Sequence, residues 1–567
     1  MKKAWWHDKI AYQIYPKSFY DTNGDGVGDI RGIIEKLDYL KMLGIDIIWV
    51  SPVYQSPFVD QGYDISDYYA IDPAFGTMDD FDELLAEIKK RDMYLIMDLV
   101  VNHCSDKHDW FQKALKDPEG EYGKYFYLRK GKNGQPPSGN YRSYFGGSVW
   151  EPIAGTEYYY FHAFAKEQPD LNWTNPKVRE EIYCMINWWL EKGVAGFRID
   201  AIINIKKDLN FPDMEPDGKD GLVSYTKFVE SVDGIEDMLQ DLKQHTFEKY
   251  NAFTIAELFN EQKEVGEYIG EQGCFSTIFD FGPHLLTLGE HGWYDAEPVE
   301  FKEWRKTIFE GQLKCKDIGF EANIIENHDE PRGVNTYLPV HAQNDAGKKM
   351  LATVMMMLRG LPFLYQGQEI GMENCRMESV EEYNDINTKD QYQLAKTAGM
   401  SNEEALLCCY RLSRDNARTP MQWNEEDNAG FTAGTPWLKV NPNYHNINVE
   451  SQIEREDSLF SHYKTLIALR KSAKYKEVLT YGDIIPEFLD DYSDKDIIAF
   501  SRRGDGKQIL TAANFGTDEV YLSLKNVQKI TLLVSNMREV LYKEGELCLR
   551  SCEAVILEIV SETGPFS

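Results

Sequence analysis

The chain has 567 residues, of which 43% are hydrophobic and 13% aromatic, so it is long enough for a large core with one or two additional domains. Its formal net charge of −32 argues against nucleic acid as a partner, and its most apolar window, residues 351–365, is interrupted by Arg359 and Pro362 and too short to cross a bilayer. Nine scattered cysteines without a CxxC pair, and an N-terminus without the apolar stretch of a secretion signal, predict a cytosolic protein with reduced thiols.

The first predicted strand, residues 10–16, runs into a loop of oxygen-bearing side chains and glycines. The loop carries Asp21, Asn23, Asp25 and Asp29 at alternate positions, with Val27 as the one gap. Oxygen ligands at this spacing can surround a hard cation, as in the first half of an EF-hand, although the closing Glu of an EF-hand is missing. The spacing therefore favours a structural metal over a solvated turn, with Ca²⁺ ahead of Mg²⁺ because the ligands are protein oxygens.

Strands and helices then alternate along most of the chain. Residues 30–43 have helical spacing, 45–50 predict a strand, 78–90 a helix and 94–101 the next strand. Further strands are predicted at 196–200, 252–257, 277–281, 322–327 and 362–366. Each strand is followed by a segment that can form a helix, and largely apolar strands are typical of a parallel sheet covered on both faces. Eight such units predict an α/β fold, a (β/α)8 TIM barrel.

Polar side chains follow several of these strands at the ends where barrel enzymes carry their catalytic residues. The strand ends supply Asp98, Asn102, His103, Arg198, Asp200, Glu257, Asn327, His328 and Asp329. Arg198 precedes Asp200 by two residues and therefore shares its side of the strand, so the guanidinium is expected to keep Asp200 ionised. Each residue alone has a structural explanation, such as an ion pair or a helix cap. Their coincidence at one rim favours a catalytic site.

These segments resemble the signature regions of the α-amylase superfamily. The four matching regions are Asp98–His103, Gly196–Asp200, Thr254–Glu257 and Asn327–Asp329. A fifth, Gln168–Asn172, is similar to the region found in the oligo-1,6-glucosidase branch. Further matching segments extend from Trp5 to about residue 430, so the resemblance covers most of the chain.

The resemblance implies a retaining, double-displacement mechanism. Asp200 would attack the anomeric carbon, Glu257 would act as acid and then base with a raised pKa, and Asp329 would bind sugar hydroxyls and distort the ring. Substrate contacts are implied for Asp60, Tyr63, His103, Phe145, Phe164, Arg198, Ala201, His328, Arg332 and Arg414. By the same resemblance, Asp21, Asn23, Asp25, the Val27 carbonyl and Asp29 would hold a structural Ca²⁺ or Mg²⁺, and no organic cofactor is expected.

The predicted domains follow from two long insertions and from a change near residue 481, where alternating strands and helices give way to short strands. The barrel would comprise residues 1–103 and 175–480, with domain B inserted after the third strand at 104–174. Short strands predicted at 497–500, 508–511, 520–523 and 554–557 indicate a C-terminal antiparallel β-sandwich over 481–567. A second insertion, residues 371–423, and domain B would overhang the rim and leave a pocket. A pocket selects chain ends, which predicts exo-action on short oligosaccharides.

The linkage is less clearly predicted. After Asp200 the chain has Ala201, where relatives that prefer α-1,6 links carry Val, so the sequence favours α-1,4 links beside isomaltose-type ones. Glu330, partly offset by Arg332, argues against a phosphorylated substrate. A sucrose- or trehalose-type hydrolase, transglucosylase or isomerase stays an alternative, and a non-catalytic barrel is disfavoured because the three carboxylates are all present. A monomer or weak homo-oligomer is expected.

Overall fold

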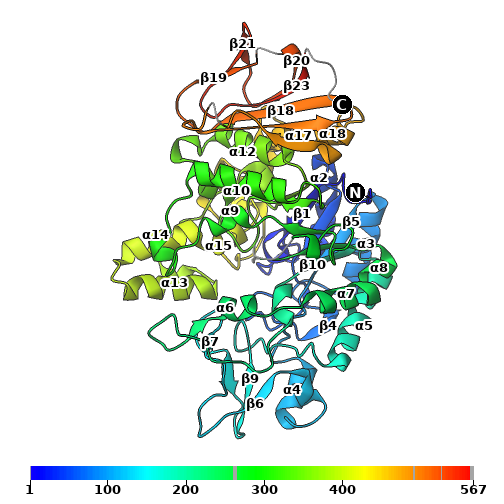
Figure 1. The fold of residues 1–567 in the computed structure, drawn as a ribbon, viewed down its shortest axis with the longest axis vertical. Helices are drawn as coiled ribbons and strands as arrows, with labels where there is room; N and C mark the ends of the chain where they lie inside the picture. Colours follow the sequence, from blue (N-terminus) through cyan, green and yellow to red (C-terminus); the bar gives the residue numbers. More distant parts are fainter. Residues whose placement is uncertain (1, 259–264, 490–491, 525–526, 562–567) are drawn as a thin grey trace. The chain divides into compact units, whose positions relative to one another are not determined.

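The structure, a computed structural model, describes residues 2–258, 265–489, 492–524 and 527–561 (Figure 1). The chain divides into two compact units, one made of residues 1–48, 91–93 and 279–567 and the other of 49–90 and 94–278. Within the described residues, no helix has the length and apolarity that crossing a membrane requires. All nine cysteines lie in these ranges and are free thiols.

Eight parallel strands form a closed barrel, which confirms the predicted fold class. In chain order they are β1 (Ala11–Ile14), β2 (Ile47–Val50), β5 (Tyr94–Leu99), β10 (Gly196–Ile199), β12 (Phe253–Ala256), β13 (Thr277–Phe279), β14 (Glu321–Asn323) and β15 (Leu361–Tyr365). Every residue of these strands is buried except Tyr94. Burial on both faces explains why the strands are nearly continuous apolar runs in the sequence.

In the unit of residues 49–90 and 94–278, β5, β10 and β12 pair in parallel. The register places Arg198 opposite Asp98 on one neighbouring strand and opposite Ile255 on the other. Helices α3 (Met78–Lys90) and α5 (Pro176–Lys192) precede β5 and β10. The α5 helix begins with a proline after the Asn175 cap and ends at Gly193, whose φ of 118° suits glycine.

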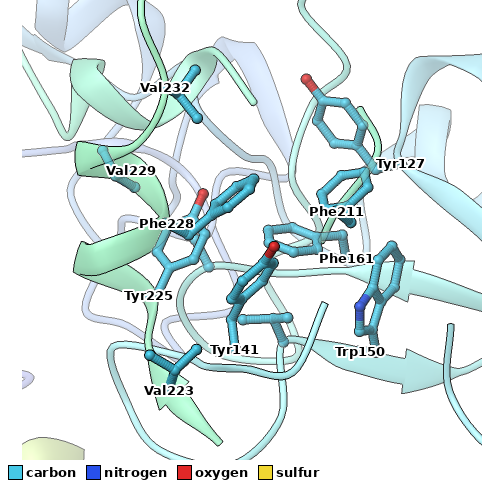
Figure 2. Close-up of a cluster of buried hydrophobic side chains, with 12 residues drawn as sticks. Tyr127, Tyr141, Trp150, Phe161, Phe211, Val223, Tyr225, Phe228, Val229 and Val232 are labelled. Atoms are coloured by element: carbon cyan, nitrogen blue, oxygen red, sulfur yellow. The ribbon is translucent and has the colours of Figure 1, made fainter. Parts of the chain in front are cut away.

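The inserted segment 104–174 contains α4 (Asp109–Lys116) and a small antiparallel sheet of β6 (Leu128–Lys130), β9 (Tyr158–Phe161) and β8 (Trp150–Pro152). Its buried side chains form one cluster with residues that follow β10, here called the insertion core (Figure 2). The members are Tyr127, Tyr141, Val149, Trp150, Phe161, Ala163, Phe211, Val223, Tyr225, Phe228, Val229 and Val232.

The insertion core is held by aromatic contacts and by a short strand pair. The rings of Tyr141 and Phe228 stack with centroids 4.3 Å apart, and Phe228 belongs to α6 (Tyr225–Glu230). In addition, β7 (Tyr141–Arg142) pairs with β11 (Val223–Ser224). The boundary predicted at residue 174 therefore passes through a single core, because residues 211–232 complete the packing of the insertion.

In the other unit, β15 pairs with β1 and β14. The single helix predicted over 30–43 is instead two helices, α1 (Ile30–Glu35) and α2 (Leu37–Leu43). Between them Lys36 leaves helical geometry, with φ −99° and ψ 4°. The ammonium group of Lys36 lies over the rings of Tyr20 and Trp423, 3.8 and 4.3 Å from the centroids, a tertiary contact that sequence periodicity cannot reveal.

The C-terminal region folds into two antiparallel sheets. The strand order of the first sheet is β16 (Asp483–Pro486), β17 (Ile497–Gly504), β18 (Lys507–Asn514), β23 (Ala554–Ser561) and β20 (Val527–Ser535). The strand order of the second sheet is β19 (Val520–Ser523), β22 (Glu546–Leu549) and β21 (Leu541–Lys543). Leu510 and Leu557 of the first sheet share one buried cluster with Leu522 and Leu547 of the second. Two sheets with a common core confirm the predicted sandwich.

Candidate active site

Arg198 on β10 is 2% exposed and contacts three carboxylates. Its Nη1 lies 2.7 Å from Asp98 Oδ1 and 2.6 Å from Asp200 Oδ1, and its Nη2 lies 2.8 Å from Glu257 Oε1. Asp98 lies near the end of β5, Asp200 directly follows β10, and Glu257 directly follows β12. Three neighbouring strands thus bring the predicted nucleophile and the predicted acid to one buried guanidinium.

Backbone contacts fix the two carboxyl groups relative to each other. The Asp200 N–H donates to the Leu99 carbonyl at 3.0 Å, and the Ala201 N–H donates to Glu257 Oε2 at 3.1 Å. Ala201 is in the left-handed region, with φ 44° and ψ 33°. This conformation costs a residue other than glycine free energy, so the turn after the nucleophile is held by its surroundings.

Asp98 has a place in the site that its position at a strand end alone does not predict. It is fully buried, and Trp49 Nε1 and the Tyr63 hydroxyl donate to its Oδ2 at 2.9 and 3.2 Å. Burial raises the pKa of Asp98 to about 6, although Arg198 lowers it. Arg198 contacts Asp200, as expected, and in addition Asp98 and Glu257. Three carboxyl groups share this guanidinium, and the charge of Glu257 adds to the rise in the pKa of Asp98.

The raised pKa of Asp98 makes stability fall as pH rises from about 4 to about 6. The pKa is about 6 in the folded protein against 3.8 for a free side chain, so the folded state binds the proton more tightly in this window. The expected loss of unfolding free energy is at most about 3 kcal/mol. Urea unfolding at pH 4.5 and pH 6.5 should show this loss in the wild type relative to Asp98→Asn. An equal change in both proteins would contradict the prediction.

A second group in this unit surrounds Gln168, from the fifth signature region. Its Nε2 lies 3.1 Å from both Asp60 Oδ2 and His103 Nε2. The Tyr63 carbonyl is 3.1 Å from the same His103 nitrogen. Burial lowers the pKa of His103, which keeps the ring neutral. The structure thus brings together the predicted Asp60, Tyr63 and His103 around Gln168.

Aromatic rings extend this group into the insertion. The Phe164 ring lies 5.1 Å from the His103 ring and 5.8 Å from the Phe145 ring, measured between centroids. Tyr144 packs on Phe164 as well, at 4.9 Å. The two predicted wall residues are therefore in contact with each other and with a predicted sugar-binding histidine.

The other unit contains the third predicted carboxylate, Asp329, which is bound by one histidine and two arginine side chains. His328 Nε2 lies 2.8 Å from its Oδ2, and Arg414 Nη1 and Arg418 Nη2 lie 3.0 and 2.8 Å from its Oδ1. Gln13 Nε2 donates to His328 Nδ1 at 2.8 Å, so the proton of the ring is on the nitrogen that faces Asp329. Burial raises the pKa of Asp329, but His328 and the two arginines outweigh it and hold the pKa well below its usual range.

Two residues that support this cluster were not predicted. Arg418 also donates from Nε to the His328 carbonyl at 2.8 Å. Asp385 is buried, caps α13 (Ile386–Thr397) and accepts from Arg414 Nε at 3.1 Å. Arg414 is therefore held between two carboxylates, which fixes its guanidinium.

Arg332 is placed differently from its prediction. The side chain is 0% exposed, its Nη1 lies 3.1 Å from Glu326 Oε1, and the same nitrogen donates to the Gln366 carbonyl at 2.8 Å. Glu330 instead accepts from Asn327 Nδ2 at 3.1 Å. The predicted offset of Glu330 by Arg332 is wrong, because Arg332 turns into the interior and offsets Glu326.

The predicted metal loop is shaped by its own hydrogen bonds. Asp21 accepts from the backbone N–H groups of Asn23, Gly24 and Gly26 at 2.8 to 2.9 Å, and Asp29 caps α1. In the part of the chain that the structure describes, no three His, Cys, Asp or Glu side chains are grouped to hold a metal ion. Both oxygens of Asp21 accept two hydrogen bonds each, the fourth from the Thr432 hydroxyl. Asn23 Oδ1 and Asp25 Oδ1 each accept one backbone N–H, and side-chain oxygens of this kind are the ligands that a hard cation prefers.

Comparison with known proteins gives concordant matches. Residues 13–482 match the family described as alpha amylase, catalytic domain. An oligo-1,6-glucosidase of Halalkalibacterium halodurans is 43% identical over 551 residues, which cover 95% of this chain and 96% of that protein. The crystal structure of Bacillus licheniformis trehalose-6-phosphate hydrolase superposes with a TM-score of 0.90 at 38% identity, covering 99% of this chain and 100% of that one. The crystal structure of a Klebsiella isomaltulose synthase superposes with a TM-score of 0.92 at 36% identity, again covering 99% of this chain and 100% of that one.

Proposed function

Because the chain belongs to the alpha-amylase family and is a glycoside hydrolase, we propose that it is a retaining α-glucosidase that releases glucose from the non-reducing end of short α-glucosides. The observation that carries the proposal is the pair of carboxyl groups, Asp200 and Glu257, bound to adjacent nitrogens of Arg198. Retaining enzymes need their two carboxyl groups only about 5 to 5.5 Å apart, and a shared guanidinium supports such a short separation.

In the first step, Asp200 attacks the anomeric carbon while Glu257 donates a proton to the departing glycosidic oxygen. The C–O bond to the aglycone breaks and a covalent glucosyl-enzyme forms. The contact between the Ala201 N–H and Glu257 Oε2 supports these roles, because it orients the acid against the turn that carries the nucleophile.

In the second step, Glu257 removes a proton from water, and the water oxygen replaces Asp200 at the anomeric carbon. Two displacements restore the original configuration. We assign Asp329 its predicted role in binding sugar hydroxyls, and its low pKa supports an ionised acceptor at neutral pH. Positioned acceptors of this kind strengthen their hydrogen bonds as the sugar distorts.

The proposed substrates are isomaltose-type oligosaccharides and, because Ala201 is small, maltose-type ones. The oligo-1,6-glucosidase relative supports the first. The structural likeness to a trehalose-6-phosphate hydrolase and an isomaltulose synthase keeps hydrolysis of sucrose or trehalose, and glucosyl transfer or isomerisation, as the alternative. Water and a sugar hydroxyl compete for the same glucosyl-enzyme, so hydrolysis and transfer share the first step.

The decisive experiment measures initial rates on isomaltose, maltose, sucrose and trehalose with one preparation, and the anomer released by NMR. We expect α-glucose as the first product from p-nitrophenyl α-glucoside, whose only sugar is the transferred glucose, whereas isomaltose and maltose also release a reducing-end glucose of mixed anomers. A tenfold preference for isomaltose corresponds to about 1.4 kcal/mol and would define an oligo-1,6-glucosidase. Initial release of β-glucose from p-nitrophenyl α-glucoside would contradict the retaining mechanism, and turnover of sucrose or trehalose alone would favour the alternative.

We also propose that the loop of Asp21, Asn23, Asp25, Val27 and Asp29 binds Ca²⁺, or Mg²⁺ in its place, as a structural ion. Removing a ligand that binds only the folded state lowers stability, by about 2.7 kcal/mol when the ion is present at 100 times its Kd. Dialysis against EDTA should therefore lower the Tm by several degrees, and added Ca²⁺ should restore it. Asp25→Asn should remove the Ca²⁺ response. An identical Tm with EDTA and with Ca²⁺ in the wild type would contradict the proposal.

A cytosolic location and a monomer or weak homo-oligomer stay predictions from the sequence.

A further inference from the structure

Lys207 and Asp170 form an ion pair inside the protein, and the proposed mechanism does not use it. The side chains of both residues are 0% exposed, and Lys207 Nζ lies 2.8 Å from Asp170 Oδ2. Burial lowers the pKa of Lys207, and Asp170 opposes that shift. Taking two charges out of water is costly, so a pair at this depth is weak as a source of stability alone. The other hydrogen bonds of Lys207 and Asp170 indicate a role beyond stability.

Lys207 reaches the segment that carries the proposed nucleophile. Its Nζ donates to the Asn204 carbonyl at 2.6 Å and lies 3.4 Å from Asn102 Oδ1. Asn204 belongs to η3 (Ile202–Ile205), a short helix that follows Ala201 and therefore lies directly after the nucleophile turn. The Tyr144 hydroxyl donates to Asn204 Oδ1 at 3.2 Å, so a residue of the insertion that packs on Phe164 contacts the same helix.

Asp170 connects the ion pair to the inserted segment. Its Oδ1 accepts from the Ala163 N–H at 2.9 Å, and its backbone forms a bridge with His103. Two residues earlier, Gln168 contacts Asp60 and His103, the predicted sugar-binding residues. The carboxylate of Asp170 thus anchors the segment that presents Gln168.

We propose that Lys207 and Asp170 are a positioning pair for catalysis, an inference that rests on the proposed glucosidase function. The pair ties the turn after Asp200 to the segment of the insertion that orders Gln168 and His103. The left-handed Ala201 makes such a tie necessary, because its turn costs free energy and persists only while neighbouring contacts hold it. Loss of the tie relaxes this turn and moves Asp200 relative to the bound glucosyl group.

The test compares Lys207→Met, Asp170→Asn, the double variant and a matched control, Lys206→Met. Lys206 is the neighbouring lysine, and its Nζ donates to the Gly234 carbonyl at 2.6 Å, away from the pair. Active sites are counted by mass spectrometry after trapping the glucosyl-enzyme with a slow fluoroglucoside. The kcat per trapped site and the KM are measured with p-nitrophenyl α-glucoside, and the Tm is recorded for each protein.

We expect kcat per trapped site to fall about 10- to 100-fold in Lys207→Met with little change in KM, since small misplacements of reacting groups cost rates of this size. Lys206→Met should match the wild type. The double variant buries no unpaired charge, so it should recover Tm but not kcat. If Lys207→Met fails to fold, the double variant decides by the same criterion.

A kcat per trapped site that stays at the wild-type value, or returns with Tm in the double variant, would show a purely structural pair and overturn the inference. A wild type that turns over no α-glucoside would overturn the proposed function and this inference together. An active wild type with an unaffected double variant would overturn the inference alone.

Discussion

Asp200→Asn is expected to lower kcat on isomaltose by about 10⁴-fold or more, the size of effect seen when a covalent nucleophile is removed. The amide keeps the shape of the side chain and an oxygen that can accept from Arg198 Nη1, which lies 2.6 Å from Asp200 Oδ1. The loss therefore reports the missing negative charge at the anomeric carbon. The measurement is a steady-state assay with a radiolabelled or coupled glucose readout, because the residual rate will be very low.

A smaller variant, Asp200→Gly, separates a nucleophile from a merely structural acid. With an aryl α-glucoside and sodium azide, the anion should enter the vacated space and yield β-glucosyl azide. Asp109→Asn on α4, where the side chain is 69% exposed, is the matched control and should keep full activity. Residual activity above about 1% in Asp200→Asn would assign the nucleophile elsewhere.

Glu257→Gln is expected to lower kcat/KM on isomaltose by about 10³-fold, since general acid catalysis contributes roughly 10² to 10⁴. The loss should depend on the leaving group. A sugar alkoxide needs a proton to depart, whereas a dinitrophenolate does not, so the first step on dinitrophenyl α-glucoside should remain fast. The glucosyl-enzyme should then accumulate, because the base for the second step is also missing.

The two substrates serve as controls for each other within one variant. Stopped-flow assays should show a burst of dinitrophenolate followed by slow turnover, and added azide should yield α-glucosyl azide from the accumulated intermediate. Equal losses on both substrates, without a burst, would argue that Glu257 orients Arg198, whose Nη2 lies 2.8 Å from Glu257 Oε1, and is not the acid.

The sequence was sufficient to predict the barrel and the residues at its strand ends, because both depend on local pattern. Apolar runs mark buried strands, and the polar residues after β10 and β12 follow directly from their bounds. The partners of Arg198 were only partly predicted. Asp98 contacts it because β5 and β10 pair in a particular register, and register is a tertiary property.

Other site residues were missed for related reasons. Lys207 stands beside Lys206 and looks like a solvated pair in the sequence, yet it is fully buried because Asp170 lies opposite it in the fold. Arg418 and Asp385 are separated from Asp329 by long stretches of chain, and no local signal joins them. The error over Arg332 arose in the same way, from the assumption that neighbours in sequence share a charge environment.

The shared insertion core also bears on the order in which the protein folds during synthesis. Six of the twelve buried members of the insertion core belong to residues 211–232, which leave the ribosome well after residue 174. Until then, rings such as Tyr141 and Phe161 lack their final partners, so the insertion cannot mature as an autonomous domain. A nascent chain paused between α5 and α6 would present this incomplete aromatic surface to chaperones, and β10, with Asp200 directly after it, would emerge before the insertion could close over its own core.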